Sequence, residues 1–445
     1  MKQLFSSKRI LAFILTFIMI VSNIKLIPVY AVEETVVYVD GVNGLDTNDG
    51  LSDTTPLKTL KAAYGKVPAD NVKSTIVVMS ELQLAPDVAP YTYNSSDKTY
   101  SRNESVDENS LQLDWSRQLS NIDMYIFPEH VGEIVITSGV DGDGNHIGAL
   151  DFNGKAFSLS GHTTIENIKI TGEADCIYAR FHKLTLGEGL TAVDGVTYYP
   201  ANSIYMGIGT NMTYNPDTNK ANLNNFAYDE AKTDVQFNMN SGYVKTVYGG
   251  NKSHSIAKAK PYDVYIDVNG GKITDLYGSS LGSGTSYADG HNDINITLSG
   301  NSEVKNLYGA HAKVEITGNI KIALEDNAKV TAKIQALHTD SGTGMTTKLA
   351  ETGDVILNLN GSNISIPAVN NGFKHLGLNG SDLTIAGETV EKVDMTDDST
   401  LTFTCAPTNA VNVAVTNNDD AWNTTTALIT APTGTSVNLS LTDAS

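Results

Sequence analysis

One short stretch of the chain groups charged side chains that could act on an acidic sugar. Glu173, Asp175, Arg180 and His182 lie within ten residues of one another. Carboxylates can hold Ca²⁺ against a uronate, and an arginine could then remove the proton beside the uronate carboxyl group. Alternation along a strand would place Arg180 and His182 on one face. The plainer interpretation, which we favour, is a surface ion pair that contributes about 0 to 1 kcal/mol to stability.

A second candidate is the D-x-D-x-N spacing of a calcium loop. Asp141, Asp143 and Asn145 would supply its side-chain oxygens. The EF-hand pattern also requires glycine at the sixth position and glutamate at the twelfth, where this chain has His146 and Phe152. We therefore expect a glycine-rich turn without metal or cofactor, with bound Ca²⁺ as the alternative.

A long polar segment over residues 190–232 concentrates aromatic rings among many asparagines. Rings that stack on sugar faces, with amides for the hydroxyl groups, are typical of a ligand-binding surface. The alternative is that the rings attach the segment to the rest of the fold. The ligand-binding candidates are Tyr198, Tyr199, Tyr205, Tyr214, Phe226 and Tyr228.

An internal sequence repeat indicates which strands position these residues. Three copies of one pattern begin at Asp234, Asp263 and Asp293, at spacings of 29 and 30 residues, and each contains Tyr-Gly near its end. Weaker copies begin at Asn319 and Asp354. A repeat of about 20–50 residues indicates a solenoid, a propeller or another array.

Within one repeat, apolar and polar residues alternate as in a half-buried strand. Val264, Ile266 and Val268 should point inward, with Tyr265 and Asp267 outside. Each repeat offers two or three short strands in about 30 residues, whereas a propeller blade needs four strands and ~40 residues. The sequence therefore predicts an all-β parallel β-helix whose coils stack about 4.8 Å apart.

Tyr248, Tyr277 and Tyr308 take the same place in successive repeats. Equal positions of a solenoid stack on one another, so these rings should form a ladder. The ladder would suit sugar rings, but the glycine after each tyrosine indicates a tight backbone turn. We expect a structural stack in which each ring packs on the next.

The first 31 residues are typical of a secretory signal peptide. Basic residues precede an apolar run from Ile10 to Val21, and Val29 and Ala31 fit cleavage after Ala31. The run is shorter than the roughly 20 residues of a spanning helix, so no membrane span should remain. Removing four basic residues takes the formal net charge from −20 to −24, which disfavours nucleic acid as a partner. We expect a secreted or cell-surface protein.

Residues 32–445 should form a single β-helix domain. Cys176 and Cys405 are too far apart along its axis to pair, so we expect free, mostly buried thiols. The final residues are strand-like and lack a capping element, so either the last loop covers this end or the protein continues. The expected parts are a cap segment over 36–66, insertions at 85–122 and 190–232, Tyr-Gly repeats over 234–373 and further coils over 374–445.

The cap segment carries the most specific pattern. Val37-Tyr38-Val39-Asp40-Gly41 leads through Asp46 and Gly50 to Thr55-Pro56-Leu57-Lys58-Thr59-Leu60. This resembles the first segment of pectate-lyase-like right-handed parallel β-helix proteins of bacterial cell surfaces, and the Tyr-Gly repeats resemble coils of such proteins. The resemblance implies a right-handed β-helix with a short capping helix over Thr59–Lys66. Members include polysaccharide lyases, glycosidases and noncatalytic adhesins, so the fold is implied more strongly than any activity.

Taken together, the sequence favours an exported, noncatalytic and monomeric adhesin-type protein that binds a polysaccharide or cell-surface glycan. The alternative is a pectate-lyase-like polysaccharide lyase or a glycosidase acting on an acidic polysaccharide. In a lyase, Arg180 would point into a groove together with Glu173 and Asp175. A glycosidase needs grouped carboxylates, and the paired acids Asp397-Asp398 and Asp419-Asp420 are instead typical of turns.

Overall fold

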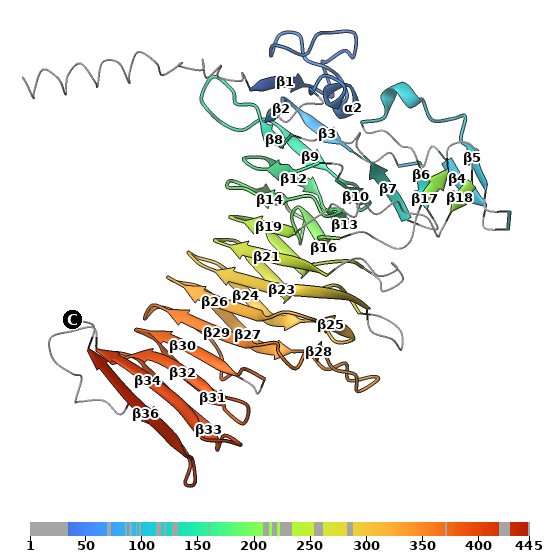
Figure 1. The fold of residues 1–445 in the computed structure, drawn as a ribbon. Coiled ribbons are helices and arrows are strands. Elements are labelled where there is room, and N and C mark those ends of the chain that lie inside the picture. Colours follow the sequence, from blue (N-terminus) through green and yellow to red (C-terminus); the bar gives the residue numbers. More distant parts are fainter. Residues whose placement is uncertain are drawn as a thin grey trace, which may run out of the picture. The chain divides into compact units, whose positions relative to one another are not determined.

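The chain folds as a right-handed parallel β-helix, as the repeat predicts (Figure 1). Nearly all of its regular structure is β, and equivalent strands of successive coils pair in parallel. The computed structural model describes residues 34–68, 73–84, 87–88, 91–94, 96–97, 99–112, 117–119, 122–126, 132–159, 161–207, 213–215, 220–222, 234–252, 261–282, 288–369, 372–417 and 428–443.

The largest sheet has 16 strands and takes one strand from almost every coil (Figure 1). Two short strands lie beside its main path, β25 (Val314–Ile316) and β28 (Lys348–Leu349). Along the main path the strands are β1 (Thr35–Val39), β2 (Ser74–Val78), β8 (Ile134–Ser138), β11 (Thr163–Ile165), β14 (Leu184–Leu186), β19 (Val235–Met239), β21 (Tyr262–Val268), β23 (Ala288–Leu298), β26 (Ile320–Glu325), β29 (Val355–Asn360), β30 (His375–Asn379), β32 (Lys392–Thr396), β34 (Val411–Asn417) and β36 (Val437–Asp443).

Smaller sheets form the other sides of the coils. A 9-stranded sheet contains β27 (Lys329–Leu337), β24 (Glu303–Ala310), β22 (Lys272–Tyr277), β20 (Tyr243–Tyr248), β16 (Ala201–Tyr205), β13 (Ala174–Tyr178), β10 (Ala156–Ser158), β7 (Ile122–Ile126) and β6 (Arg117–Leu119). A 4-stranded sheet contains β15 (Thr191–Ala192), β12 (Lys169–Gly172), β9 (Ala149–Asp151) and β3 (Glu81–Gln83). A 3-stranded sheet contains β31 (Asp382–Ala386), β33 (Thr400–Cys405) and β35 (Ile429–Thr430).

Apolar and polar residues alternate along each strand, and the apolar ones form the core, as in β21. Val264, Ile266 and Val268 are fully buried, whereas Tyr265 points outward and is 37% exposed, as predicted. Apolar residues of successive coils fall in register and form one continuous core along the stack. Both cysteines are free thiols, one buried and one half-buried, in agreement with the prediction.

A ladder of side chains explains the aspartate or asparagine at the start of three successive repeats, those of Asp263, Asp293 and Asn319. The Asp263 carboxylate accepts the backbone N–H of Asp293 at 2.9 Å, and the Asp293 carboxylate accepts that of Asn319 at 2.8 Å. Asn319 in turn accepts the N–H of Asp354 at 3.0 Å. Lys321 adds an ion pair with Asp293 at 3.0 Å. Each side chain therefore holds the first N–H of the next coil, which would otherwise lack a partner.

The cap segment begins the stack as the resemblance implied. Helix α2 (Leu60–Tyr64) is short, and the Thr59 hydroxyl caps it by accepting the N–H of Ala62 at 3.1 Å. The Asp46 carboxylate accepts the backbone amides of Lys58 and Thr59, each at 2.9 Å. Leu60 and Tyr64 are buried beneath the first coil, so the helix covers this end of the core.

The two predicted insertions pair with each other in part. Strands β4 (Tyr91–Asn94), β5 (Thr99–Arg102), β18 (Lys220–Asn222) and β17 (Thr213–Asn215) form one antiparallel sheet beside the coils (Figure 1). Lys220 pairs with Thr99 and so joins segments that are far apart in sequence. A 3₁₀-helix, η1 (Glu108–Ser110), also lies in the first insertion. The second segment is not wholly an insertion, because β16 within it is a strand of the 9-stranded sheet.

The last strand extends the inward columns of the core. Leu439 and Leu441 of β36 pair with Val413 and Val415 of β34, which are buried. Leu439 is 57% and Leu441 59% exposed. The described residues therefore leave the core uncovered beyond β36.

We predict that Asp293→Ala lowers the free energy of unfolding by about 1–3 kcal/mol, because it leaves the N–H of Asn319 without its acceptor. Urea unfolding followed by circular dichroism would measure the change. Asp267→Ala, an outward aspartate on the neighbouring strand that is not part of the ladder, should change stability by no more than about 0.5 kcal/mol. Equal effects of the two substitutions would contradict the assigned role of the ladder.

Candidate functional site

The acidic members of the predicted catalytic cluster lie on either side of the start of β13. The Glu173 carboxylate accepts the backbone N–H groups of Thr197 at 3.1 Å and Tyr198 at 2.7 Å. Asp175 lies on β13 and is exposed. Glu173 is therefore engaged in holding the backbone of the following coil.

Arg180 and His182 lie in the turn after β13. Arg180 adopts a φ of 53°, and its Nη1 atom donates to the carbonyl oxygen of Leu159 at 3.3 Å. His182 is only 7% exposed, and its ring packs edge-on against His162 with 5.8 Å between centroids. Both contacts join one coil to the next, so a structural role accounts for these two residues.

The predicted calcium spacing belongs to a turn closed by its own aspartate. Asp141 Oδ1 accepts the backbone N–H of Asn145 at 2.8 Å and that of Asp143 at 2.9 Å. The hydrogen bonds from Asn145 are the main reason why the pKa of Asp141 is lowered. This geometry is typical of aspartate turns. In the described part of the chain, no group of three or more His, Cys, Asp or Glu side chains could hold a metal ion.

The described rings of the aromatic segment contact the coils. Tyr198 packs edge-on against Tyr243 with 5.0 Å between centroids. Tyr199 packs against the core, and its carbonyl oxygen accepts the N–H of Tyr243 at 2.9 Å. Tyr205 ends β16 and is 6% exposed, so its ring is not available to a ligand. Tyr214 lies on β17, whereas Phe226 and Tyr228 lie outside the described residues.

Five tyrosines form a continuous stack along the 9-stranded sheet. From Tyr178 through Tyr205, Tyr248 and Tyr277 to Tyr308, consecutive centroids lie 5.5, 5.0, 5.1 and 4.6 Å apart. Each ring is the register partner of the next, so the ring spacing follows the strand spacing. The predicted ladder is confirmed, and it is longer than predicted by two rings.

Other side chains cover this stack. Lys252 Nζ lies 5.6 Å from the centroid of Tyr178 and donates to the Tyr178 hydroxyl at 3.0 Å. His311 packs edge-on against Tyr277, and His338 against Tyr308, each at 4.9 Å. Burial raises the pKa values of all five tyrosines. The stack is therefore a structural element of the corner rather than an open strip for sugar rings.

A buried serine–histidine pair lies between β22 and β23. Ser280 Oγ is 3.2 Å from His291 Nε2, and both residues are fully buried. The backbone N–H of Ser280 donates to the same Nε2 atom at 3.1 Å, so this nitrogen accepts and the ring proton lies on Nδ1. Gly250 closes over the pair, since a Cβ atom there would lie 2.3 Å from Ser280 Oγ. A substrate has no access to this hydroxyl, and the pair stabilises the turn.

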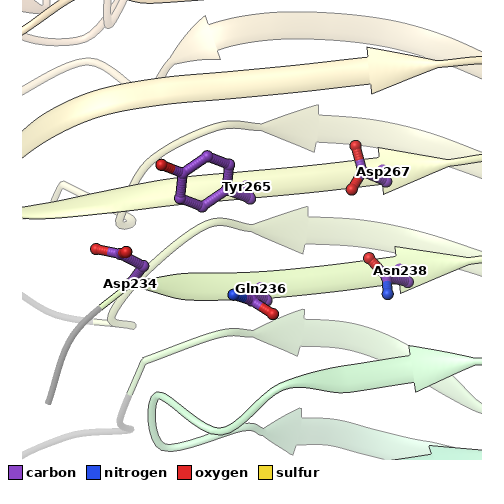
Figure 2. Close-up of a pocket in the computed structure, with 5 residues that line it drawn as sticks. All are labelled: Asp234, Gln236, Asn238, Tyr265 and Asp267. Atoms are coloured by element: carbon purple, nitrogen blue, oxygen red, sulfur yellow. The ribbon is translucent and has the colours of Figure 1, made fainter. Parts of the chain in front are cut away.

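The outward face of the 16-stranded sheet carries an open groove around one exposed ring. Its volume is about 410 Å³, and its lining residues are Asp234, Gln236, Asn238, Tyr265 and Asp267. Figure 2 shows Gln236 and Asn238 along β19, Asp234 just before that strand, and Tyr265 and Asp267 along β21, with Asp267 beside Asn238. In the register of the two strands, Gln236 lies opposite Tyr265, and Asn238 opposite Asp267.

Strand length explains why the groove lies at this point. β14 pairs with β19 only over Phe237–Met239, so Gln236 has no partner residue on β14. The inward neighbours Val235, Phe237 and Val264 are fully buried. The groove side chains therefore project from backbone that the core holds in place.

The groove side chains keep their hydrogen-bonding capacity for a ligand. Within the described ranges, none of the five lining side chains forms a hydrogen bond or ion pair with another residue. Elsewhere on the β-helix, polar side chains bond from coil to coil, as Asn269 does to Asn240 at 3.2 Å and Asn379 to Asn360 at 2.8 Å.

The groove is also acidic. Burial, followed by the negative charges of Asp263, Asp234 and Asp293, raises the pKa of the Tyr265 hydroxyl. Asp267 adds a further carboxylate to the lining. The groove therefore combines open amides, carboxylates and one aromatic face.

Sequence reasoning predicted the outward orientation of Tyr265 and Asp267 but gave them no function. A usable indication was present in the aligned repeats. At the position of Tyr265, the neighbouring repeats have Gln236 and Asn295. An aromatic residue that interrupts an outward column of amides is the signal that could have directed attention to this face.

Comparisons with protein-family models, with curated proteins and with solved structures gave no match to the chain. In the part of the chain that the structure describes, no helix is long and apolar enough to cross a membrane. The function has to be inferred from the groove itself.

We predict that Tyr277→Ala lowers the free energy of unfolding by about 2–4 kcal/mol, because it removes a ring from the middle of the stack. Tyr277→Phe keeps the ring and should cost no more than about 1 kcal/mol. Urea unfolding curves would compare the two variants. Equal losses would show that stacking is not what this residue contributes.

We also predict that His291 makes the fold sensitive to acid. Burial lowers its pKa in the folded protein to about 3 from an ordinary value of 6.5. Between these values the unfolded chain binds a proton that the folded chain does not. The stability that depends on neutral His291 is therefore complete above pH 6.5 and is lost as the pH falls towards 3.

Urea unfolding at several pH values between about 7 and 4 would test this titration. His291→Gln can still accept the Ser280 N–H but cannot titrate, so its stability should fall less steeply with pH than that of the wild type. His146→Gln, at an exposed histidine, should keep the wild-type slope. A wild-type slope in His291→Gln would refute the assignment.

Proposed function

We propose that this chain is a noncatalytic, exported β-helix protein that binds a glycan in the groove between β19 and β21. It would act as an adhesin-type member of the pectate-lyase-like β-helix proteins of bacterial cell surfaces. One observation carries the proposal. The groove presents an exposed tyrosine ring among polar side chains whose hydrogen-bonding groups are open.

The chemistry of the groove suits a sugar. The face of Tyr265 can stack on the apolar face of a pyranose ring, as aromatic residues do in many carbohydrate sites. Gln236 and Asn238 offer amide donors and acceptors, and Asp234 and Asp267 offer acceptors for hydroxyl groups. A partner with hydroxyl groups on its rim and an apolar ring face would satisfy all five side chains.

The β-helix supports binding because it holds the groove in advance of the ligand. The inward residues of β19 and β21 are fully buried in the continuous core. Side chains on such a backbone lose less conformational entropy on binding than side chains on a loop. Repetition of the coil also leaves an elongated face along which a polymer could lie.

The lyase alternative receives less support from the same structure. It requires Arg180 in a groove together with Glu173 and Asp175. Glu173 instead accepts two backbone amides, and Arg180 donates to the carbonyl oxygen of Leu159. A binding function needs no rearrangement of these contacts.

We predict that Tyr265→Ala weakens binding to the best glycan on an array by at least about tenfold, because the stacking surface is lost. Its melting temperature should stay close to that of the wild type, since Tyr265 contributes nothing to the core. Tyr38→Ala, a partly exposed tyrosine on β1, serves as the matched control and should bind normally. Unchanged binding by Tyr265→Ala would place the site elsewhere.

A further inference from the structure

The charge of the groove restricts the kind of glycan that it can hold. Its lining includes the carboxylates of Asp234 and Asp267, and none of its five lining residues is basic. Lys321 affects the Tyr265 hydroxyl, but this lysine already pairs with Asp293 at 3.0 Å. The whole chain has a formal net charge of −20. A ligand therefore meets negative potential both at the groove and on approach.

We infer that the ligand is a cationic glycan, a polymer of amino sugars with free amino groups such as β-1,4-linked glucosamine. This inference rests on the proposed glycan-binding function and adds the charge of the ligand to it. An ammonium group would pair with Asp267 or Asp234, while the sugar ring stacks on Tyr265. The amides of Gln236 and Asn238 would take the remaining hydroxyl groups.

The arrangement of the groups matches such a ligand. Tyr265 and Asp267 lie on the same face of β21, two residues apart, so ring face and carboxylate point the same way. Asn238 lies opposite Asp267 on the neighbouring strand, about 4.8 Å away. One sugar residue that lies across the two strands therefore meets the ring, one carboxylate and one amide together.

Other ligand classes fit less well. A uronate polymer would bring its carboxylates against Asp234 and Asp267, and the repulsion would oppose binding. A neutral glycan would bind through Tyr265 and the amides but would leave the two carboxylates without a counter-ion. The free amino group is thus the feature that also offsets the negative charge of the groove carboxylates.

Isothermal titration calorimetry with three oligosaccharides of equal length tests the inference. The probes are a glucosamine oligomer with free amines, its fully N-acetylated counterpart and a galacturonate oligomer. We expect the amine form to bind at least about tenfold more tightly than the acetylated form. Raising NaCl from about 20 to 200 mM should weaken binding of the amine form more than binding of the other two oligomers, because salt screens exposed charge pairs.

Charge-neutralising variants assign the effect to the groove. Asp267→Asn and Asp234→Asn should each weaken binding of the amine form by about threefold to fivefold, and leave the acetylated form unchanged. The matched control is Asp394→Asn. Asp394 lies in the same outward column as Asp267, five strands further along, but is paired with Lys392 at 2.6 Å.

The outcomes separate the two proposals. Equal or tighter binding of the acetylated or galacturonate oligomer, lost in Tyr265→Ala, would overturn the cationic ligand and keep the glycan site. Equal effects of Asp394→Asn and Asp267→Asn would also overturn it, because the preference would then reflect net charge alone. If no probe and no glycan on an array binds, both the ligand class and the proposed function are wrong.

Discussion

The core and the side-chain ladders of this protein depend on parallel pairing of equivalent strands, whose register carries over from coil to coil along most of their length. In the largest sheet, each strand finds its partner one coil away. Buried valine, isoleucine and leucine residues therefore fall above one another and form a single core. A shift of one residue would turn the whole apolar set outward, so the core itself enforces the register.

The same register arranges polar residues into ladders. Asp263, Asp293 and Asn319 each accept the first N–H of the next coil, and five tyrosines stack within about one strand spacing of each other. These ladders use side chains to satisfy backbone groups and to fill the corners. The recurrent aspartate or asparagine and the recurrent tyrosine of the repeats therefore have structural roles.

The groove differs from the ladders because its side chains do not bond or stack from one coil to the next. Asp234, Gln236, Asn238 and Asp267 surround Tyr265 without bonding to one another or to the ladders. In the described part of the chain these polar groups form no hydrogen bond that would stabilise the fold, and the outward Tyr265 is not part of the core. In our proposal these residues bind a ligand, and their negative charge would favour a partner that brings a positive group.

The sequence by itself determined the architecture and the direction of individual side chains. Repeats of 29 and 30 residues with period-2 alternation predicted a parallel β-helix, an inward Val264 and an outward Tyr265. The Tyr-Gly spacing predicted the stacking of Tyr248, Tyr277 and Tyr308, and the cap motif predicted a short helix after Thr59. The strand directions and the ring stacking follow from local periodicity, because alternation and turn residues act within a few positions of the chain. The short helix was instead implied by the resemblance of the cap segment to pectate-lyase-like proteins.

Only the tertiary structure decided which residues meet. The sequence predicts that Tyr205 binds a ligand, but this residue lies in β16 and extends the tyrosine stack. The repeat pattern is interrupted there, so β16 is recognisable only from the strands with which it pairs. The groove depends on β14 being shorter than β19, and the roles of Glu173 and Arg180 depend on backbone atoms of neighbouring coils. Such contacts join residues about 20 or more positions apart. They are set by the pairing of whole coils, so they cannot be predicted from the local sequence.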